Sequence, residues 1–217
     1  MGRTIPVRNC VVDVLRREIL SLRFAPGQKL VERDLCELTG ASRTALREGL
    51  RQLEVEGLVE IVPNRGPLVP DLSPGQAQDI YEMRICLERH LAGQAALRAN
   101  GREILALKGI RERVIRAIGQ QDRIALTDAK VAYYDWLLAI GDNEEIDLSM
   151  RRLLGRSSLI WPKLVTTNPL MAEDSATEFG EIVDAISEHD ERRAAAAAEV
   201  HLQSALKAVL EHLEDEP

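Results

Sequence analysis

Three arginines on one predicted helix face are the residues of this chain whose type and spacing could do chemistry. Arg43, Arg47 and Arg51 recur every fourth residue, so they share one face of a helix. A guanidinium group can form two hydrogen bonds with a guanine edge in the major groove of DNA, or pair with a backbone phosphate. Spaced charges are also typical of a solvated helix face, and Glu48 and Glu54 lie nearby. The spacing alone leaves both interpretations open.

The elements that must position these arginines are two short helices joined by a glycine turn. Leu30, Leu35 and Leu38 fall on one face of a predicted helix over residues 31–38, and Gly40 follows where a left-handed backbone can end it. Ser42 is a typical N-cap for the second helix. That helix is predicted to pack through an apolar stripe made of Ala45, Leu46, Leu50 and Leu53.

A β-hairpin is predicted directly after the second helix. Residues 58–62 and 67–70 fit two short strands, and Pro63-Asn64-Arg65-Gly66 fits the turn between them. Such a hairpin is the wing of a winged helix-turn-helix, and it can place Arg65 and Gly66 near the DNA backbone or the minor groove. On its own, this turn is more often an ordinary exposed loop, since Pro, Asn and Gly dominate turns of every kind.

The same stretch resembles the DNA-binding domain of the GntR family of transcription regulators. The resemblance covers about the first third of the chain and rests on Pro26 to Leu35, Ser42 to Val59 and Pro63 to Gly66. It implies that operator DNA is contacted by Arg33, Arg43, Arg47 and Arg65, with Thr44 and Gly66 as supporting contacts. The family usually has proline at the position of Ala45, a departure that leaves the start of the helix intact.

Composition and charge fit a cytoplasmic protein of two domains. The chain has 217 residues, 45% of them hydrophobic, and a net charge of −7. Residues 1–72 are close to neutral, and we expect them to form the DNA-binding domain; residues 73–217 carry the acidic excess and are expected to bind an effector and to dimerise. No apolar run is long enough to cross a bilayer, and the N-terminus lacks the apolar block of a signal peptide.

The three cysteines indicate a reducing compartment. Cys10, Cys36 and Cys86 are scattered and odd in number, and their spacing fits neither a disulfide framework nor a metal site. We expect them to be buried thiols.

From Ser73 onward the pattern is helical, which makes the fold mainly α: a winged helix-turn-helix with a small β-hairpin wing, followed by an all-α antiparallel bundle. Ser73 and Pro74 mark the start of the first helix of this bundle. A bundle of this size can enclose a ligand between its helices. The six predicted helices cover approximately residues 75–98, 102–118, 122–140, 144–158, 172–188 and 191–213.

This helical part resembles the effector-binding FCD domain of the FadR-like branch, and its six helices are similar to the VanR-type subgroup. The residues that carry the resemblance are Tyr81 to Glu88, Leu137 to Asn143, Ile182 to Ile186 and His201. Many members bind a divalent metal there through an aspartate and a histidine four apart on one helix, plus two histidines from the last two helices.

The metal-ligand positions of that family are mostly occupied by other residues in this chain. By position they are Lys130, Tyr134, Phe179 and His201, and only the histidine matches. An ammonium group among the donors repels a cation. The carboxylates of Asp128, Asp135 and Glu178 are expected on other helix faces. We therefore expect no metal and no other cofactor.

A small organic acid is the expected effector. Arg84 lies on the inward stripe of its predicted helix, where a buried cation needs a partner. We expect Arg84, Lys130, Tyr134 and His201 to line a pocket that holds the anion directly through cations and hydrogen bonds. An internal ion pair between Arg84 and Glu88, four residues on, is the alternative. His201 by itself is more typical of a packed, hydrogen-bonded core residue.

No motif in the sequence indicates an enzyme. A Gly-rich phosphate loop, a nucleophile elbow and a metal-protease histidine pair are all missing. The family resemblance implies instead a homodimer on double-stranded, palindromic operator DNA, without membrane association, and repression that the effector relieves. The alternative is a DNA-binding regulator whose helical domain only dimerises and senses no ligand.

Overall fold

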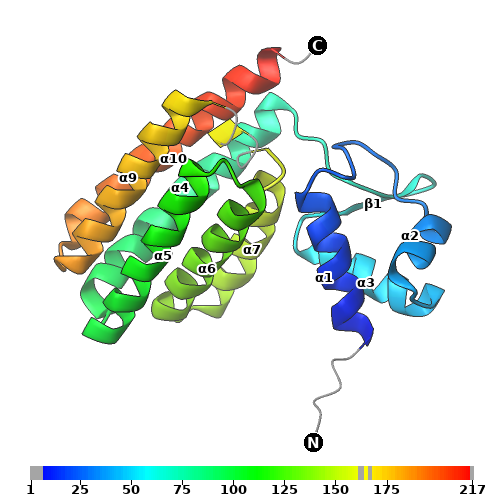
Figure 1. Cartoon of the computed structure of the whole chain (residues 1–217), viewed down its shortest axis with the longest axis horizontal. Helices are drawn as coiled ribbons and strands as arrows, with labels where there is room; N and C mark the ends of the chain where they lie inside the picture. Colours follow the sequence, from blue (N-terminus) through cyan, green and yellow to red (C-terminus); the bar gives the residue numbers. More distant parts are fainter. Residues whose placement is uncertain (1–6, 161–163, 166–167, 216–217) are drawn as a thin grey trace, which may run out of the picture. The chain divides into compact units, whose positions relative to one another are not determined.

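The computed structural model describes residues 7–160, 164–165 and 168–215 (Figure 1). The chain divides into two compact units, Met1–Leu72 together with Arg151–Leu159, and Ser73–Met150 together with Ile160–Pro217. The first unit contains a small antiparallel sheet, and the described structure is otherwise mainly helical. Within the described residues, no helix is both long enough and apolar enough to span a membrane. The assignment of DNA binding to residues 1–72, and of effector binding and dimerisation to residues 73–217, stays a prediction.

The first unit begins with a helix that we did not predict from the sequence, α1 (Val7–Leu20). Val12, Leu15 and Ile19 of this helix are buried, at a spacing that puts them on one helical face. α1 packs on α3 (Arg43–Val55), in which Leu46 and Leu53 are also fully buried. The apolar stripe of α3 is thereby covered, and the opposite face of that helix is left to solvent.

The turn between the two predicted helices forms as the sequence indicates. α2 (Glu32–Thr39) ends at Gly40, which has a left-handed backbone with a φ of 66° and donates its N–H to the carbonyl of Cys36. α3 follows Ser42, whose side-chain oxygen accepts a hydrogen bond of 3.3 Å from the N–H of Ala45. Because both signals are local, the predicted starts and ends of these helices lie close to the observed ones.

Replacing Ser42 with alanine is expected to lower the free energy of unfolding by about 1 kcal/mol, because a backbone N–H at the start of α3 loses its acceptor. Ser42→Asp keeps an acceptor and adds a negative charge at the helix N-terminus, so its stability should stay near that of the wild type. Urea titration of the three proteins measures both effects. If Ser42→Ala and the wild type are equally stable, the N-cap contributes nothing.

The wing is a two-stranded antiparallel hairpin. β1 (Glu60–Val62) pairs with β2 (Gly66–Leu68), and Val62 lies opposite Gly66 in the register. Asn64 in the turn between the strands has a φ of 63°, and Gly66, the first residue of β2, has a φ of 82°. Both residue types tolerate this left-handed region better than others do, so the predicted Pro-Asn-Arg-Gly turn has the chemistry that its backbone needs.

Both strands are shorter than predicted, because the flanking residues make other hydrogen bonds. Leu58 and Val59 donate their N–H groups to the carbonyl of Leu53 and close the end of α3. At the other side, Val69 donates its N–H to the carbonyl of Gln28, at 3.0 Å. The chain that precedes α2 therefore runs beside the hairpin and fixes it to the unit.

All six helices predicted after Ser73 are present. Ser73 and Asn100 each form a capping box at the first two of them, and Asp122 caps the third by accepting from the N–H of Ala125. The predicted break at residues 161–169 lies partly outside the described residues. The helices are α4 (Pro74–Arg98), α5 (Gly101–Gly119), α6 (Arg123–Gly141), α7 (Glu144–Ser157), α9 (Pro169–Ser187) and α10 (Glu191–Asp215).

The helices of the second unit pack against one another as a bundle (Figure 1). α10 lies against α4 and α9, α5 lies against α6 and α9, and α4 also contacts α6. Small side chains allow two helices to approach closely. Both α4 and α10 bury several alanines: Ala92, Ala95, Ala96, Ala194, Ala197 and Ala198.

The cysteines are less buried than expected. Cys36 and Cys86 are free thiols, and Cys36 is half-buried on α2. Cys86 is exposed on α4, so the expectation of a buried thiol is wrong there. It falls on the face of α4 away from the core, two residues after the inward-facing Arg84. The side chain of Cys10 lies outside the described residues.

Candidate DNA-binding surface and buried polar cluster

The arginines of α3 lie on its solvent face. Arg43, Arg47 and Arg51 are exposed, as is Thr44, whereas the leucines of the same helix are buried. This is the division into a packing face and a guanidinium face that the spacing predicted. A helix that is anchored on one side and carries cations on the other can enter the major groove of DNA.

Arg47 and Glu32 connect α3 to α2 through two hydrogen bonds. Nε of Arg47 donates to Oε1 of Glu32 at 2.9 Å, and Nη2 donates to Oε2 at 3.1 Å. The hydrogen bonding with Arg47 lowers the pKa of Glu32 below its ordinary value, and the charge of Arg43 acts in the same direction. The carboxylate is therefore ionised at neutral pH and forms a charged pair with the guanidinium.

The remaining predicted DNA contacts lie on α2 and on the wing. Arg33 is exposed and pairs with the adjacent Asp34, with Nε 3.1 Å from Oδ1. Such an exposed pair is weak, so the guanidinium can readily change partners. Arg65 is exposed between the strands. No atom lies within 4 Å of where a Cβ on Gly66 would be, so the positive φ rather than space favours glycine there.

The six predicted DNA-contact residues thus belong to α2, α3 and the wing of one unit, and all but the half-buried Gly66 are exposed. Which of them touch DNA stays a prediction.

Arg84 lies inside the helical unit in a closed set of hydrogen bonds. Its Nε donates to Oε1 of Glu88 at 2.8 Å, and its Nη2 donates to the hydroxyl of Tyr134 at 2.7 Å. The Tyr134 hydroxyl in turn donates to the other oxygen of Glu88 at 3.2 Å. The side chains of Arg84 and Glu88 are only 6% and 5% exposed. The internal ion pair considered from the sequence is therefore present.

A second set of contacts joins α6, α9 and α10. Nζ of Lys130 lies 3.2 Å from Nε2 of His201, and Nδ1 of His201 lies 3.0 Å from Oε2 of Glu178. Oε1 of Glu178 accepts a hydrogen bond of 2.6 Å from the hydroxyl of Ser204. Glu178 therefore faces α10, and the expectation that it points to another helix face is wrong. Phe179 is buried beside it, with its ring centre 4.5 Å from Nζ of Lys130.

These two sets form what we call the buried polar cluster, of which Lys130 and Glu178 are half-buried: Arg84, Glu88, Lys130, Tyr134, Glu178 and His201. The four residues predicted to bind an effector are all members, and Glu178 is the member that sequence reasoning missed. If the ammonium of Lys130 donates to Nε2 of His201, the proton of the neutral imidazole sits on Nδ1 and is donated to Glu178. Two cations, two carboxylates and one neutral imidazole then leave the cluster without net charge.

Burial and neighbouring charges shift the pKa values of Arg84, Lys130 and His201. Burial is the largest single effect and opposes the charge of Arg84, but Glu88, Tyr134 and Tyr81 together outweigh it, so the pKa of Arg84 is raised. Burial lowers the pKa of Lys130 to about 8. Burial, helped by the ammonium of Lys130, also lowers the pKa of His201 to about 4. At neutral pH the imidazole is therefore neutral and the ammonium still mostly charged.

His201 is expected to make the free energy of unfolding fall in mildly acidic solution. Its pKa in the folded protein is about 4, below the ordinary value of 6.5, so between these values the unfolded chain binds a proton that the folded protein excludes. The stability that His201 contributes is complete above pH 6.5 and decreases as the pH falls towards 4, by at most about 1.4 kcal/mol per pH unit. Urea titrations near neutrality and near pH 5 measure the decrease.

The control for this prediction removes the titrating group and keeps hydrogen bonding. The charged groups that act on His201 are Lys130 on α6, Glu178 on α9 and Arg84 on α4. His201→Gln should lose less stability than the wild type over the same pH interval. An identical loss in both proteins would assign the acid sensitivity to other residues.

The donor groups of the cluster do not suit a metal ion. Across the part of the chain that the structure describes, no three His, Cys, Asp or Glu side chains converge as a metal ion requires. The imidazole of His201 faces an ammonium on one side and a carboxylate on the other. Cations and hydrogen-bond donors of this kind instead suit the carboxylate of a small organic molecule.

The fold and its surface define a DNA-binding transcription regulator. They combine a helix-turn-helix whose second helix carries arginines, a hairpin wing and a helical unit. The family model for the bacterial regulatory proteins of the gntR family matches residues 8–69, and the model for the FCD domain matches residues 79–204. The chain belongs to the GntR family of transcription regulators and carries an FCD domain.

Proteins of similar sequence are named as transcription regulators. The chain is 28% identical over 141 residues to an HTH-type transcriptional regulator of Agrobacterium vitis from the TAR-I ttuE-ttuC' intergenic region, an alignment of 64% of this chain and 80% of that protein. It is 33% identical over 96 residues to the transcriptional repressor RspR of Escherichia coli K12, across 44% of this chain and 42% of that one. It is 34% identical over 137 residues to the Uxu operon regulator of Haemophilus influenzae, across 55% and 50%. The last two alignments span about half of those relatives or less.

Solved structures share the fold over nearly the whole chain. Escherichia coli McbR/YncC superposes with a TM-score of 0.81 at 16% identity, covering 98% of this chain and 100% of that one. A GntR transcriptional regulator from Rhodococcus sp. RHA1 gives a TM-score of 0.73 at 20% identity, covering 97% and 98%. The three sequence relatives and the Rhodococcus protein are named as transcription regulators, and this chain is a regulator as well.

Proposed function

We propose that this protein is a repressor that binds double-stranded operator DNA as a homodimer and responds to a small organic acid. The observation that carries the DNA-binding part is the exposed row of Arg43, Arg47 and Arg51 on a helix whose other face is buried. Two copies would set their recognition helices about 34 Å apart, in successive major grooves of a palindromic site. Repression is proposed because RspR, a relative, is named as a repressor. Operator DNA lies in the cytoplasm, and we propose that the protein acts there.

The proposed operator contacts come from three elements. α3 would enter the major groove with Arg43 and Thr44 at its N-terminal end and Arg47 one turn further on. Arg33 would reach DNA from α2, and the wing would bring Arg65 and Gly66 to the backbone or the minor groove. Because residues 1–72 are close to neutral, the attraction of one copy to phosphate is limited, and a pair of copies would strengthen it.

The buried polar cluster is the proposed effector site. Arg84 and Lys130 would supply positive charge to a carboxylate ligand, and Tyr134 and His201 would supply hydrogen bonds. In the structure Arg84 and Tyr134 already bind the carboxylate of Glu88, and His201 binds that of Glu178. A ligand carboxylate would therefore exchange with one of those side chains and free it to move.

Such an exchange connects ligand binding to the packing of the helices. Glu88 belongs to α4 and Glu178 to α9, so displacing either carboxylate removes a bond between two helices of the bundle. A repacked bundle would change the distance between the two recognition helices of a dimer. Coupling of this kind typically alters operator affinity by ~1–3 kcal/mol.

One observation favours a simpler role for the helical unit. The charges of the buried polar cluster cancel, and each of its members has a hydrogen-bond partner within the cluster. A buried network that is satisfied in this way can fix the packing of helices without any ligand. The second candidate is therefore a DNA-binding regulator whose helical unit only dimerises and senses no ligand.

Selection from a pool of randomised duplexes by the purified full-length protein tests the DNA-binding part. We expect a palindromic consensus, and light scattering on the eluted complex should give two protein copies per duplex. If no sequence is enriched over random DNA at moderate ionic strength, with or without added metabolites, the proposed function is wrong.

A panel of small carboxylates, screened by thermal shift, separates the two candidates for the helical unit. Each stabilising compound is then tested for its effect on the affinity for the selected duplex. A compound that changes DNA affinity in the wild type but not in Lys130→Met supports sensing at the buried polar cluster. A panel without such a compound favours a helical unit that only dimerises.

A further inference from the structure

We infer that Glu32 is a positioning residue for DNA recognition, which holds the guanidinium of Arg47 so that its outer edge is presented to a guanine base. The inference rests on the proposed function, because it takes Arg47 as a DNA contact. It is carried by the geometry of the ion pair between Glu32 of α2 and Arg47 of α3.

A guanidinium group has two edges on which it can form paired hydrogen bonds. The side edge consists of the N–H of Nε and one N–H of Nη2, and the end edge consists of N–H groups on Nη1 and Nη2. In Arg47 the side edge is occupied, because Nε lies 2.9 Å from Oε1 of Glu32 and Nη2 lies 3.1 Å from Oε2. The end edge has no hydrogen-bond partner among the residues described here. A pair of parallel N–H groups is what the O6 and N7 acceptors of guanine require.

The two partners differ in how firmly they are held. Glu32 is the first residue of α2, where the free N–H groups of the helix favour a carboxylate. Its side chain is 32% exposed, whereas that of Arg47 is 64% exposed. The carboxylate is therefore the less exposed partner, favoured by the helix N-terminus, and the guanidinium is the projecting one. An arginine whose rotamer is already fixed loses less conformational freedom when it binds a base.

Glu32 is also expected to shift the preference of Arg47 from the phosphate backbone of DNA to the edges of its bases. A guanidinium paired with a carboxylate has little net charge, so it attracts phosphate less than a free arginine does. The directional hydrogen bonds of its end edge remain. Glu32 is therefore expected to weaken sequence-independent attraction and to strengthen discrimination between bases.

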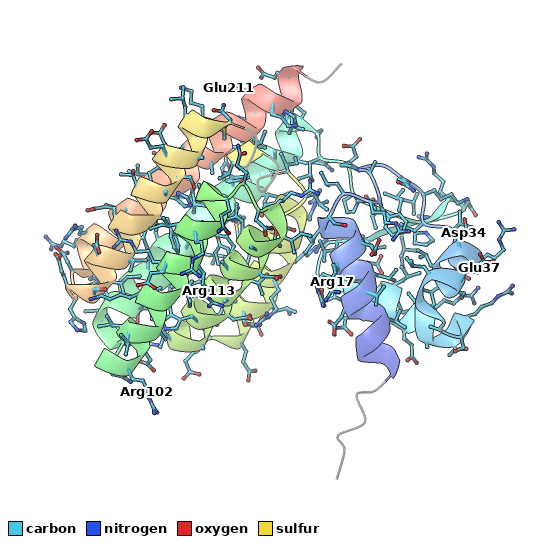
Figure 2. All side chains as sticks on the ribbon, viewed as in Figure 1. Arg17, Asp34, Glu37, Arg102, Arg113 and Glu211 are labelled. Carbon is cyan, nitrogen blue, oxygen red and sulfur yellow. The ribbon has the colours of Figure 1, made fainter. Side chains whose placement is uncertain are left out.

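Glu37 provides a matched control on the same helix. It is exposed on the outer side of α2 (Figure 2) and forms no ion pair within the described part of the chain. Glu37→Gln and Glu32→Gln remove the same charge from α2, but only the second change touches Arg47. Any effect of charge alone on DNA affinity should appear equally in both variants.

The test uses a duplex selected by the full-length wild-type protein. Affinities for this duplex, for each of its single-base variants and for random duplex are measured by fluorescence anisotropy at several salt concentrations. Glu32→Gln should lose about tenfold of its preference at one base pair in each half-site, whereas Glu37→Gln should keep that preference. Arg47→Ala should lose preference at the same base pair, and adding Glu32→Gln to it should cause no further loss.

A shorter carboxylate separates geometry from charge. Glu32→Asp keeps the negative charge but cannot reach Arg47 in the same way, so it should lose preference at that base pair while its affinity for random duplex stays unchanged. Thermal melting of each variant establishes that it is folded.

Two results would overturn the inference and leave the proposed function intact: full preference in Glu32→Asp, or a loss in Glu32→Gln no larger than in Glu37→Gln. A wild-type protein that selects no sequence at all would instead remove the proposed function, and this inference with it.

Discussion

Arg84→Met is expected to lower the free energy of unfolding by about 3–5 kcal/mol, measured by urea titration. Methionine replaces much of the apolar stem of arginine but none of its hydrogen bonds to Glu88 and Tyr134. The carboxylate of Glu88, a residue that is 4% exposed, is then left without its cation. A buried charge without a partner costs far more than the contacts that the substitution removes.

A second substitution shows whether the stranded carboxylate is the cause. Arg84→Met combined with Glu88→Met removes both charges and should recover most of the lost stability, because apolar side chains can replace a buried ion pair at little cost. Near-UV circular dichroism checks that the core is still packed. A double variant as unstable as Arg84→Met alone would show that the loss has another origin.

Arg43→Ala is expected to weaken binding to the selected operator by about 1–3 kcal/mol, with relaxed preference at one base pair. Arg43 is exposed and is the first residue of α3. The N-terminal end of a recognition helix is the part that contacts base edges in the major groove. Binding isotherms with the selected duplex and its single-base variants give both quantities.

Arg51→Ala is the matched control, since Arg51 is an exposed arginine of the same helix, two turns further on. It should weaken binding to selected and random duplex by the same factor, through the loss of one charge near phosphate. If Arg43→Ala also weakens both equally, Arg43 acts through its charge and does not read a base.

The parts of the fold that depend on local chemistry could be predicted closely from the sequence. Gly40 ends α2, Ser42 begins α3, and Ser73 and Asn100 begin α4 and α5, because each satisfies backbone groups only a few residues away. α1 was missed, although the spacing of its buried residues is an ordinary helical signal: Val12, Leu15 and Ile19.

The candidate sites show where such prediction stops. The pair of Arg84 and Glu88 could be anticipated, because residues four apart on a helix are neighbours. The contacts of His201 with Lys130 and Glu178 join residues 71 and 23 positions apart. They depend on how α6, α9 and α10 are rotated against one another, which the periodicity of a single helix does not determine. The orientation of Glu178 was predicted wrongly for this reason.

The buried polar cluster draws its members from four different helices, α4, α6, α9 and α10. A hydrogen bond weakens steeply once its atoms separate beyond normal contact, so gradual sliding of α6 against α4 would break the bonds of Tyr134 with Arg84 and Glu88 and leave buried polar groups unsatisfied. Halfway positions are therefore unfavourable, and the bundle should move between distinct arrangements instead of bending continuously. A molecule with only a few polar atoms could then decide between two shapes of an entire domain.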